Sequence, residues 1–376
     1  MSASRVKEVT VPTADELLSA RAVIELAECL RVAAPDQGWT RVRASTKTFD
    51  GLALGERAVV VRDALLADLP ASYAATAKIV RTMLKNEAFT SWMIWPVGEA
   101  AALKSLASTK SGVFEDGLRL LAQLTGRFSS EFAIRSFLNA DLQRTLDAAV
   151  IWTQDPDEAV RRLASEGTRP RLPWAKQVPA FRAQPAAAIE ILTRLYRDES
   201  ETVRRSVANH LNDISRADPD LAVRTAALWL KMPDANTPRL VRHAMRTLIK
   251  QAHPAALSLM GFAASETVSI GRPKVQAKVV PLGGELVFES VVVNQGTSEI
   301  RLVIDYVVHY QKANGTQAPK VFKLSTKTLA PGERLRINKR HSFKPISTRK
   351  HYAGRHTIEL QVNGSRSQGT SFDVVT

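Results

Sequence analysis

The sequence has a single cysteine, Cys29, among its 376 residues. One cysteine cannot form an internal disulfide bond or a thiolate metal cage, so the fold depends on its apolar core. Such a core is available, because 45% of the residues are hydrophobic and 24% are charged, which is typical of globular proteins. At this length we expect two or three domains.

Long apolar runs and cofactor motifs are absent as well. No stretch approaches the roughly eighteen apolar residues of a membrane-spanning helix, and residues 1–21 contain no apolar run of signal-peptide length. The sequence has no His, Cys and carboxylate cluster at metal-ligand spacing, no glycine-rich phosphate loop and no Gly-x-Ser-x-Gly turn. We therefore expect a cytoplasmic protein that uses no metal ion and no small-molecule cofactor.

Acidic residues are in short supply. The chain has 37 Asp and Glu against 52 Lys and Arg, which gives a net charge of +15. A surplus of this size favours a polyanionic partner through the summed field and counterion release. Nucleic acid is the first candidate for that partner, and an anionic membrane surface is the second.

From about residue 15 to residue 262 the apolar residues recur at helical spacing, in segments separated by Pro, Gly, Asp and Ser. In residues 199–214, for example, Val203, Val207 and Leu211 share one stripe of an amphipathic helix. The segment DESETVRRSVANHL resembles a HEAT-type repeat, and stacked repeats bury a continuous core beside a long concave face. We predict a HEAT-like helical-repeat domain, an α-solenoid, over residues 1–265.

Near Thr267 the apolar pattern changes to a period of two. Segments such as IRLVIDYVVHYQ, HTIELQVNG and TSFDVV follow at the spacing of short strands, with Gly283 and Gly284 at a turn. We predict an immunoglobulin-like β-sandwich without a disulfide over residues 266–376. Residues 267–376 hold 17 Lys and Arg against seven Asp and Glu. This excess favours a second clamp on DNA phosphates, with a merely soluble basic domain as an equal alternative.

One cationic stripe stands out in the helical region. Its members follow one another at intervals of three, four and four residues, which places four cations on one face of one predicted helix. The pattern favours a phosphate-facing stripe, and the alternative is a solvated face near a helix C-terminus. The stripe consists of Arg239, Arg242, Arg246 and Lys250. Weaker candidates for the same groove are Arg161, Arg162, Arg169, Arg171, Arg204 and Arg205.

Two acidic residues fall at predicted helix C-termini. Asp213 lies in the last turn of its helix and Glu166 ends another, and there a carboxylate faces the negative end of the helix dipole. Tolerated strain of this kind often marks a functional site. The alternatives are ion pairs, of Glu166 with Arg162 and of Asp213 with Arg216, or a turn-capping role for Asp213.

Two further residues have ambiguous positions. Glu131 follows two serines in a predicted first helical turn, which indicates a capping role. Trp174 ends the proline-fixed segment RPRLPW, where its ring could stack on a base or sugar or simply cover the core.

Three longer segments carry a family resemblance. SVANHLNDISRADPD (residues 206–220), SSEFAIRSFL (129–138) and RRLASEGTRPRLPW (161–174) resemble the bacterial DNA alkylation repair glycosylases of the AlkC family, relatives of AlkD. The resemblance covers most of residues 56–262. The region of period two is similar in arrangement to the C-terminal immunoglobulin-like domain that one branch of this family carries.

The resemblance implies an activity and a site. It implies a monomeric, nucleoid-associated protein that excises cationic bases, chiefly 3-methyladenine and 3-methylcytosine, from duplex DNA without flipping them. It also implies that Glu131, Glu166, Asp213 and Trp174 lie nearest the lesion. A methylated base is already a good leaving group, so the carboxylates would stabilise an oxocarbenium-like sugar and position a water molecule, while Trp174 packs on the deoxyribose. With no Schiff-base lysine indicated, we expect hydrolysis without strand cleavage.

Two alternatives of another class stay open. The same fold could belong to a DNA-binding or scaffold protein that performs no chemistry. An adaptor that recognises another protein fits the basic composition less well.

Overall fold

A computed structural model describes residues 12–262, 266–346 and 349–376. The chain forms two compact units. The first consists of the described part of Met1–Asp218 together with Trp229–Ala244, and the second of Pro219–Leu228 with the described part of Met245–Thr376. The predicted boundary at residue 265 falls in residues 263–265, which lie outside the described residues.

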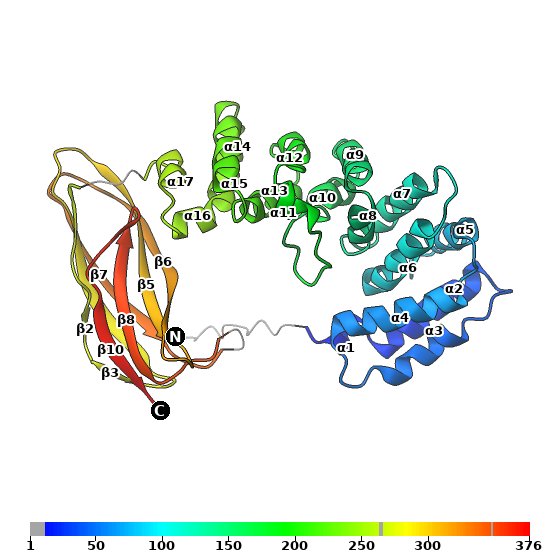
Figure 1. Ribbon diagram of the computed structural model, residues 1–376, viewed down its shortest axis with the longest axis horizontal. Helices are drawn as coiled ribbons and strands as arrows, with labels where there is room; N and C mark the ends of the chain where they lie inside the picture. The colour runs from blue at the N-terminus through cyan, green and yellow to red at the C-terminus, as the bar shows by residue number, and fades with distance from the viewer. Residues whose placement is uncertain (1–11, 263–265, 347–348) are drawn as a thin grey trace, which may run out of the picture. The chain divides into compact units, whose positions relative to one another are not determined.

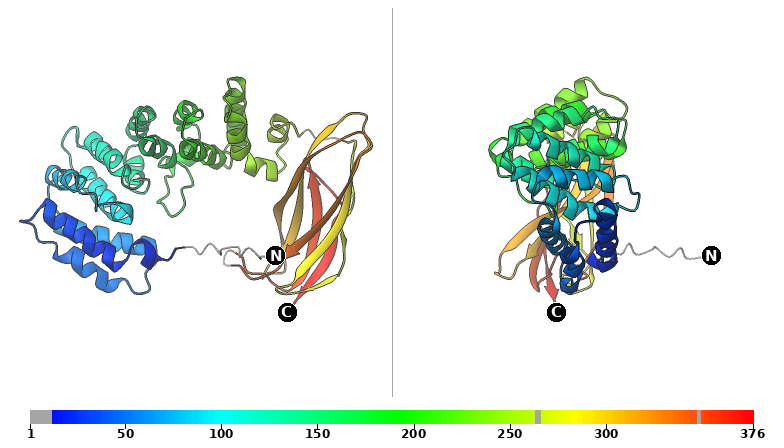
Figure 2. Two further views of the ribbon diagram at one scale, coloured as in Figure 1. Left: turned by 180° about the vertical axis from the view of Figure 1, so that it is seen from behind. Right: turned by 90° about the vertical axis from the view of Figure 1, so that its right-hand side faces the viewer.

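The first unit is helical, as predicted, and its helices lie side by side in chain order (Figure 1; Figure 2 shows them from behind). Packing is mostly between neighbours in the sequence: α10 packs against α9, α12 and α13, and α13 packs against α15. The elements are α1 (Ala14–Leu17), α2 (Ala20–Ala33), α3 (Thr40–Ser45), η1 (Thr46–Thr48), α4 (Leu54–Asp68), α5 (Tyr73–Met83), η2 (Ser91–Met93), α6 (Ile94–Leu106), α7 (Val113–Thr125), α8 (Ile134–Ala140), α9 (Leu142–Trp152), α10 (Glu158–Glu166), α11 (Ala180–Ala183), α12 (Ile189–Leu195), α13 (Glu201–Ile214) and α15 (Thr237–Ala244).

The sequence pattern of α13 explains its place in the array. Val203, Val207 and Leu211 are fully buried and form the stripe that the spacing predicts. The helix begins after Ser200 and ends at Ile214. Asp213 is therefore in the last turn, as predicted.

The second unit combines short helices with a two-sheet β-sandwich. One sheet has the order β1-β4-β2 with β7 also paired to β4, and the other has the order β3-β10-β8-β5-β6 with β9 paired to β8. The helices are α16 (Arg246–Lys250) and α17 (Pro254–Leu259), with the first part of α14 (Pro219–Lys231). The strands are β1 (Val268–Ile270), β2 (Lys274–Val275), β3 (Val279–Pro281), β4 (Glu285–Asn294), β5 (Ile300–Gln311), β6 (Gln317–Leu329), β7 (Arg334–Ser342), β8 (Gly354–Val362), β9 (Ser365–Arg366) and β10 (Thr370–Val375).

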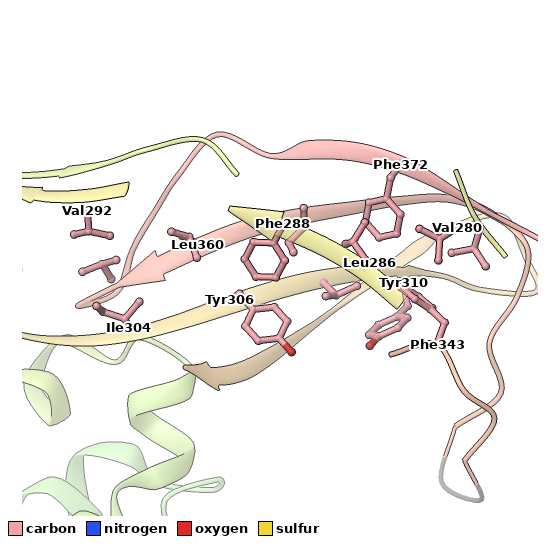
Figure 3. Close-up of a cluster of buried hydrophobic side chains, with 14 of the residues drawn as sticks. Val280, Leu286, Phe288, Val292, Ile304, Tyr306, Tyr310, Phe343, Leu360 and Phe372 are labelled. Atoms are coloured by element: carbon pink, nitrogen blue, oxygen red, sulfur yellow. The ribbon is translucent and has the colours of Figure 1, made fainter. Parts of the chain in front are cut away.

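The sandwich core replaces a disulfide with packed apolar and aromatic side chains (Figure 3). Phe288 of β4 lies against Tyr306 of β5, with ring centroids 5.3 Å apart. The strands predicted for IRLVIDYVVHYQ and TSFDVV are confirmed to the residue as β5 and β10. No comparable signal predicts β7, because its segment RLRINKRHS has the composition of a charged surface segment, although Leu335 and Ile337 pack against the core.

Within the described residues, no helix combines the length and the apolar character that crossing a membrane requires.

Candidate functional site

Glu166 and Asp213 lie close together in the first unit, where the C-terminal ends of α10 and α13 pack side by side. Both carboxylates are buried: Glu166 is 7% exposed and Asp213 is 6% exposed. Both also face the unfavourable end of a helix dipole, as the sequence predicts. Such placement requires compensation by a cation.

Arg169 provides that compensation. Its Nε donates to Asp213 Oδ2 at 2.9 Å, and its Nη1 donates to Glu166 Oε1 at 2.6 Å. The interpretation of Asp213 as a partner of Arg216 is therefore wrong, because the ion pair joins residues 44 positions apart that only the stacking of α10 and α13 brings together. Arg169 is itself buried between the two acids, whereas the sequence placed it on a surface facing DNA.

Glu131 extends the cluster on the other side. It precedes α8 in a turn, and its Oε2 accepts from Arg162 Nη1 at 3.0 Å and from Ser129 Oγ at 2.9 Å. Arg162 Nη2 also lies 3.8 Å from Glu166 Oε1, so the predicted Glu166–Arg162 contact is present but is secondary to Arg169. The capping role assigned to Glu131 is wrong, because its carboxylate pairs with a guanidinium rather than with helix N–H groups.

The five side chains Glu131, Arg162, Glu166, Arg169 and Asp213 are therefore joined in one network, which we call the carboxylate cluster. Three carboxylates against two guanidinium groups give the carboxylate cluster a net charge of −1. Its residues come from α10, α13 and the turns after α7 and α10.

Gly167 explains how these elements come so close. Its φ is −64°, which any residue can adopt, so backbone conformation does not require glycine here. A Cβ at this position would lie 2.8 Å from Ile134 Cγ2 and 2.9 Å from Leu163 O. Glycine is needed because the end of α10 packs directly on α8.

Burial governs the protonation of Asp213. Burial raises the pKa of Asp213 above its ordinary value, while the ion pair with Arg169 and the backbone N–H of Arg171 lower it and the charge of Glu166 raises it further. The ionised form of Asp213 therefore needs the positive charge of Arg169, whereas an exposed aspartate is stabilised by water.

Arg135 supports the loop that follows α10, and the sequence interpretation missed it. Its guanidinium is fully buried and donates to the carbonyl oxygens of Arg169 (2.6 Å), Gly167 (3.2 Å) and Lys176 (2.9 Å). Burial lowers the pKa of Arg135 to about 10. A signal was present, because Arg135 stands between Ile134 and Phe137 on an apolar helix face, where a cation needs a structural reason.

The loop held by Arg135 carries Trp174 to the surface. The indole is 75% exposed, and its backbone has a φ of +62°, which costs a non-glycine residue about 1–2 kcal/mol. Trp174 lines a pocket of about 840 Å³ that Asp213 also lines. A large exposed ring on a strained backbone beside a buried carboxylate indicates a functional role.

Replacing Trp174 with glycine tests whether the ring is kept on a strained backbone for its function. We expect Trp174→Gly to leave thermal stability unchanged or slightly raised, because glycine adopts the positive φ freely. If the protein releases bases, as the family resemblance implies, the variant should lower that release about tenfold or more through the lost ring contact. Ser91→Gly is the matched control, since Ser91 is exposed with a φ of 61°. Melting curves and release rates of both variants check the prediction, and a Trp174→Gly variant with wild-type release would refute it.

The predicted cationic stripe does not lie on a single helix. The chain turns at Met245, so Arg239 and Arg242 belong to α15, while Arg246 and Lys250 belong to α16. The prediction failed because Leu240, Val241, Met245 and Leu248 continue the apolar spacing through the break. These cations also fall in two compact units.

Several of the predicted DNA-facing arginines have partners within the protein. Arg239 pairs with Glu201 at 3.0 Å, although the sequence showed no acid within the stripe. Arg204 Nη1 donates to the carbonyl oxygens of Asp198 and Glu199, which ties it to the start of α13. Their role as DNA contacts remains a prediction.

His210 is a structural residue that connects two helices. It is fully buried on α13, and its Nδ1 lies 3.0 Å from the carbonyl oxygen of Ser165 on α10. Burial lowers the pKa of His210 to about 3, so the ring is neutral. It joins the two helices that position Glu166 and Asp213. Among the described residues, no group of His, Cys, Asp and Glu is arranged to hold a metal ion.

The observations define a class of protein: a helical array with a buried carboxylate cluster beside an exposed tryptophan, followed by a basic β-sandwich. Residues 269–376 match the family described as "Uncharacterised protein YhaZ, C-terminal Ig-like domain", which confirms the immunoglobulin-like fold. The uncharacterized protein YhaZ of Bacillus subtilis (strain 168) is 32% identical over 361 residues, which are 96% of this chain and 98% of that protein.

A solved structure extends the comparison. It is that of the Pseudomonas fluorescens alkylpurine DNA glycosylase AlkC bound to DNA containing an abasic site analog. It matches with a TM-score of 0.84 and 33% sequence identity, over 97% of this chain and 100% of that chain. The chain belongs to the AlkC family, in the branch with a C-terminal immunoglobulin-like domain.

Proposed function

We propose that this protein is a DNA glycosylase of base excision repair. It would hydrolyse the N-glycosidic bond of cationic alkylated bases, 3-methyladenine and 3-methylcytosine, in duplex DNA without flipping them and without cutting the strand. The observation that carries the proposal is the meeting of Glu131, Glu166 and Asp213 in one carboxylate cluster next to Trp174. The DNA-bound relative supports DNA as the partner.

The chemistry follows from the charge of the substrate. A base alkylated on a ring nitrogen is a cation and leaves without protonation, so the enzyme needs no general acid. Positive charge develops on the sugar instead, and the net charge of −1 on the carboxylate cluster stabilises that positive charge. We assign Asp213 and Glu166 to stabilising this charge and positioning water, with Glu131 assisting through Arg162.

Base release from methylated duplex DNA tests the proposal. Purified protein incubated with duplexes carrying 3-methyladenine, 3-methylcytosine or 7-methylguanine should release the free 3-methyl bases and leave an intact abasic strand. Full-strength, salt-sensitive binding with no release from any of the three substrates would favour the non-catalytic DNA-binding protein instead.

The β-sandwich is proposed as a second clamp on DNA. On β7, Arg334 and Arg336 are exposed two residues apart, and Lys339 is exposed on the same strand. None of these three side chains has an ion pair within the described ranges. Unpaired cations on one strand suit contact with phosphates.

We expect the variant Arg334→Gln, Arg336→Gln, Lys339→Gln to bind duplex DNA more weakly. The magnitude of its slope of log affinity against log salt should fall by about one to three. Fluorescence anisotropy between 50 and 200 mM salt measures both. The control replaces Lys312, Lys327 and Lys344, other lysines of the same domain, with glutamine. Equal slopes for the two variants would show that the cations of β7 do not contact DNA phosphates.

A further inference from the structure

We propose that the pocket beside Asp213 binds consecutive backbone phosphates of the damaged DNA strand through Arg171, Arg182 and Arg216. This inference rests on the proposed function and adds the ligand group that the pocket recognises. Arg171 lies in the loop after α10, Arg182 on α11 and Arg216 just beyond α13, and all three line the pocket of about 840 Å³.

The three arginines are available for a ligand. Each is exposed, and within the part of the chain that the structure describes none of their side chains has an ion pair or a hydrogen bond. The neighbouring arginines differ in this respect: Arg162 and Arg169 are held by carboxylates. The arginines that line the pocket are therefore the ones without a protein partner among the described residues, whereas the paired arginines belong to the carboxylate cluster.

Asp213, the one acid among the described residues that line this pocket, does not compensate the three arginines. It is buried and already paired with Arg169 at 2.9 Å, so the three positive charges at the pocket have no counterion among the described residues. Guanidinium groups present planar pairs of N–H donors that match phosphate oxygens. An anionic ligand is therefore the natural complement of this surface.

The form of the pocket favours a nucleic acid strand over a single small anion. Its walls include Trp174 and the rings of Pro170, Pro173 and Pro179, which offer apolar contact to sugars between charged groups. The prolines also restrict the loop, so little conformational entropy is lost when a strand binds. With the phosphates drawn to the arginines and repelled by Asp213, a sugar of the same strand would lie toward the carboxylate.

The test compares two variants that lose the same charge. The pocket variant carries Arg171→Gln, Arg182→Gln and Arg216→Gln, and the control carries Arg21→Gln, Arg41→Gln and Arg194→Gln, three exposed arginines that do not line the pocket. Affinity for a duplex with a central abasic site is measured between 50 and 200 mM salt, with circular dichroism to verify folding. The single variant Arg216→Gln serves as a second probe if the pocket variant does not fold.

We expect the pocket variant to bind the duplex at least tenfold more weakly than the control. The magnitude of its slope of log affinity against log salt should fall by about two to three. The single variant should lower the slope by about one. Slopes and affinities equal to those of the control would overturn the proposal. Because no catalysis is measured, a protein that releases no base could still pass this test, and an active glycosylase could still fail it.

Discussion

Replacing Asp213 with asparagine is expected to lower the rate of base release by about 100- to 1,000-fold, which is the usual cost of removing one electrostatic stabiliser of a transition state. Asparagine keeps the shape of the side chain but removes the negative charge that would oppose the developing charge on the sugar. DNA affinity should change little, because Asp213 is buried and repels phosphate rather than binding it. Single-turnover release and binding to an abasic duplex measure the two effects separately.

A matched control separates chemistry from folding. Asp198 also has a buried side chain, 5% exposed, that pairs with an arginine, Arg161 at 2.7 Å, and it belongs to the same unit. Asp198→Asn should cost stability while keeping release near the wild-type rate once the protein is folded. Full activity in both Asp213→Asn and Glu166→Gln would show that the active site has been assigned to the wrong residues.

Arg169→Met should destabilise the fold more than any exposed substitution. It removes the shared counterion of Glu166 and Asp213, and breaking a buried ion pair from one side costs about 3–5 kcal/mol. Arg194→Met is the control, because Arg194 pairs with Glu190 at the surface, where such a pair contributes at most about 1 kcal/mol. Urea unfolding of both variants measures the difference.

The pH dependence of this loss has a defined sign. Burial already raises the pKa of Asp213, and without Arg169 that pKa should rise further. The folded variant then binds a proton that the unfolded chain has released, so its stability falls as the pH rises from the ordinary aspartate pKa through the raised one. The loss should be smaller at pH 5 than at pH 8, and adding Asp213→Asn should restore part of it. A loss independent of pH would contradict the proposed role of Arg169.

The loss of Arg169 should also shift the pH dependence of base release to higher pH. If ionised Asp213 is needed, release falls as the pH drops through its pKa, and Arg169→Gln should shift this acid limb to higher pH.

Local signals in the sequence predicted most of the elements but few of the contacts in the site. The stripe of α13, the strand β5 and the positions of Glu166 and Asp213 at helix ends all follow from periodicity and turn residues within one segment. Arg169 could not be assigned as their shared partner, because Arg169 and Asp213 are 44 residues apart and their contact depends on how α10 and α13 are stacked. Local pattern specifies elements, whereas stacking specifies ion pairs.

Two other differences have the same origin. The break at Met245 leaves the apolar spacing unchanged, so periodicity alone reads α15 and α16 as one helix. The strand β7 was missed because its outward residues are almost all Arg, Lys or Asn, which conceal the inward Leu335 and Ile337. In both cases tertiary packing decides what a short window of sequence leaves open.

The central claim is that the carboxylate cluster at the ends of α10 and α13 performs glycosidic hydrolysis on alkylated DNA. The most direct test is single-turnover release of 3-methyladenine from a methylated duplex by the wild-type protein and by Asp213→Asn, with DNA binding measured in parallel. Rapid release by the wild type and a loss of at least about 100-fold in the variant, at nearly equal DNA affinity, is the result expected. Equal release by both proteins, or none by the wild type despite tight binding, would contradict the claim.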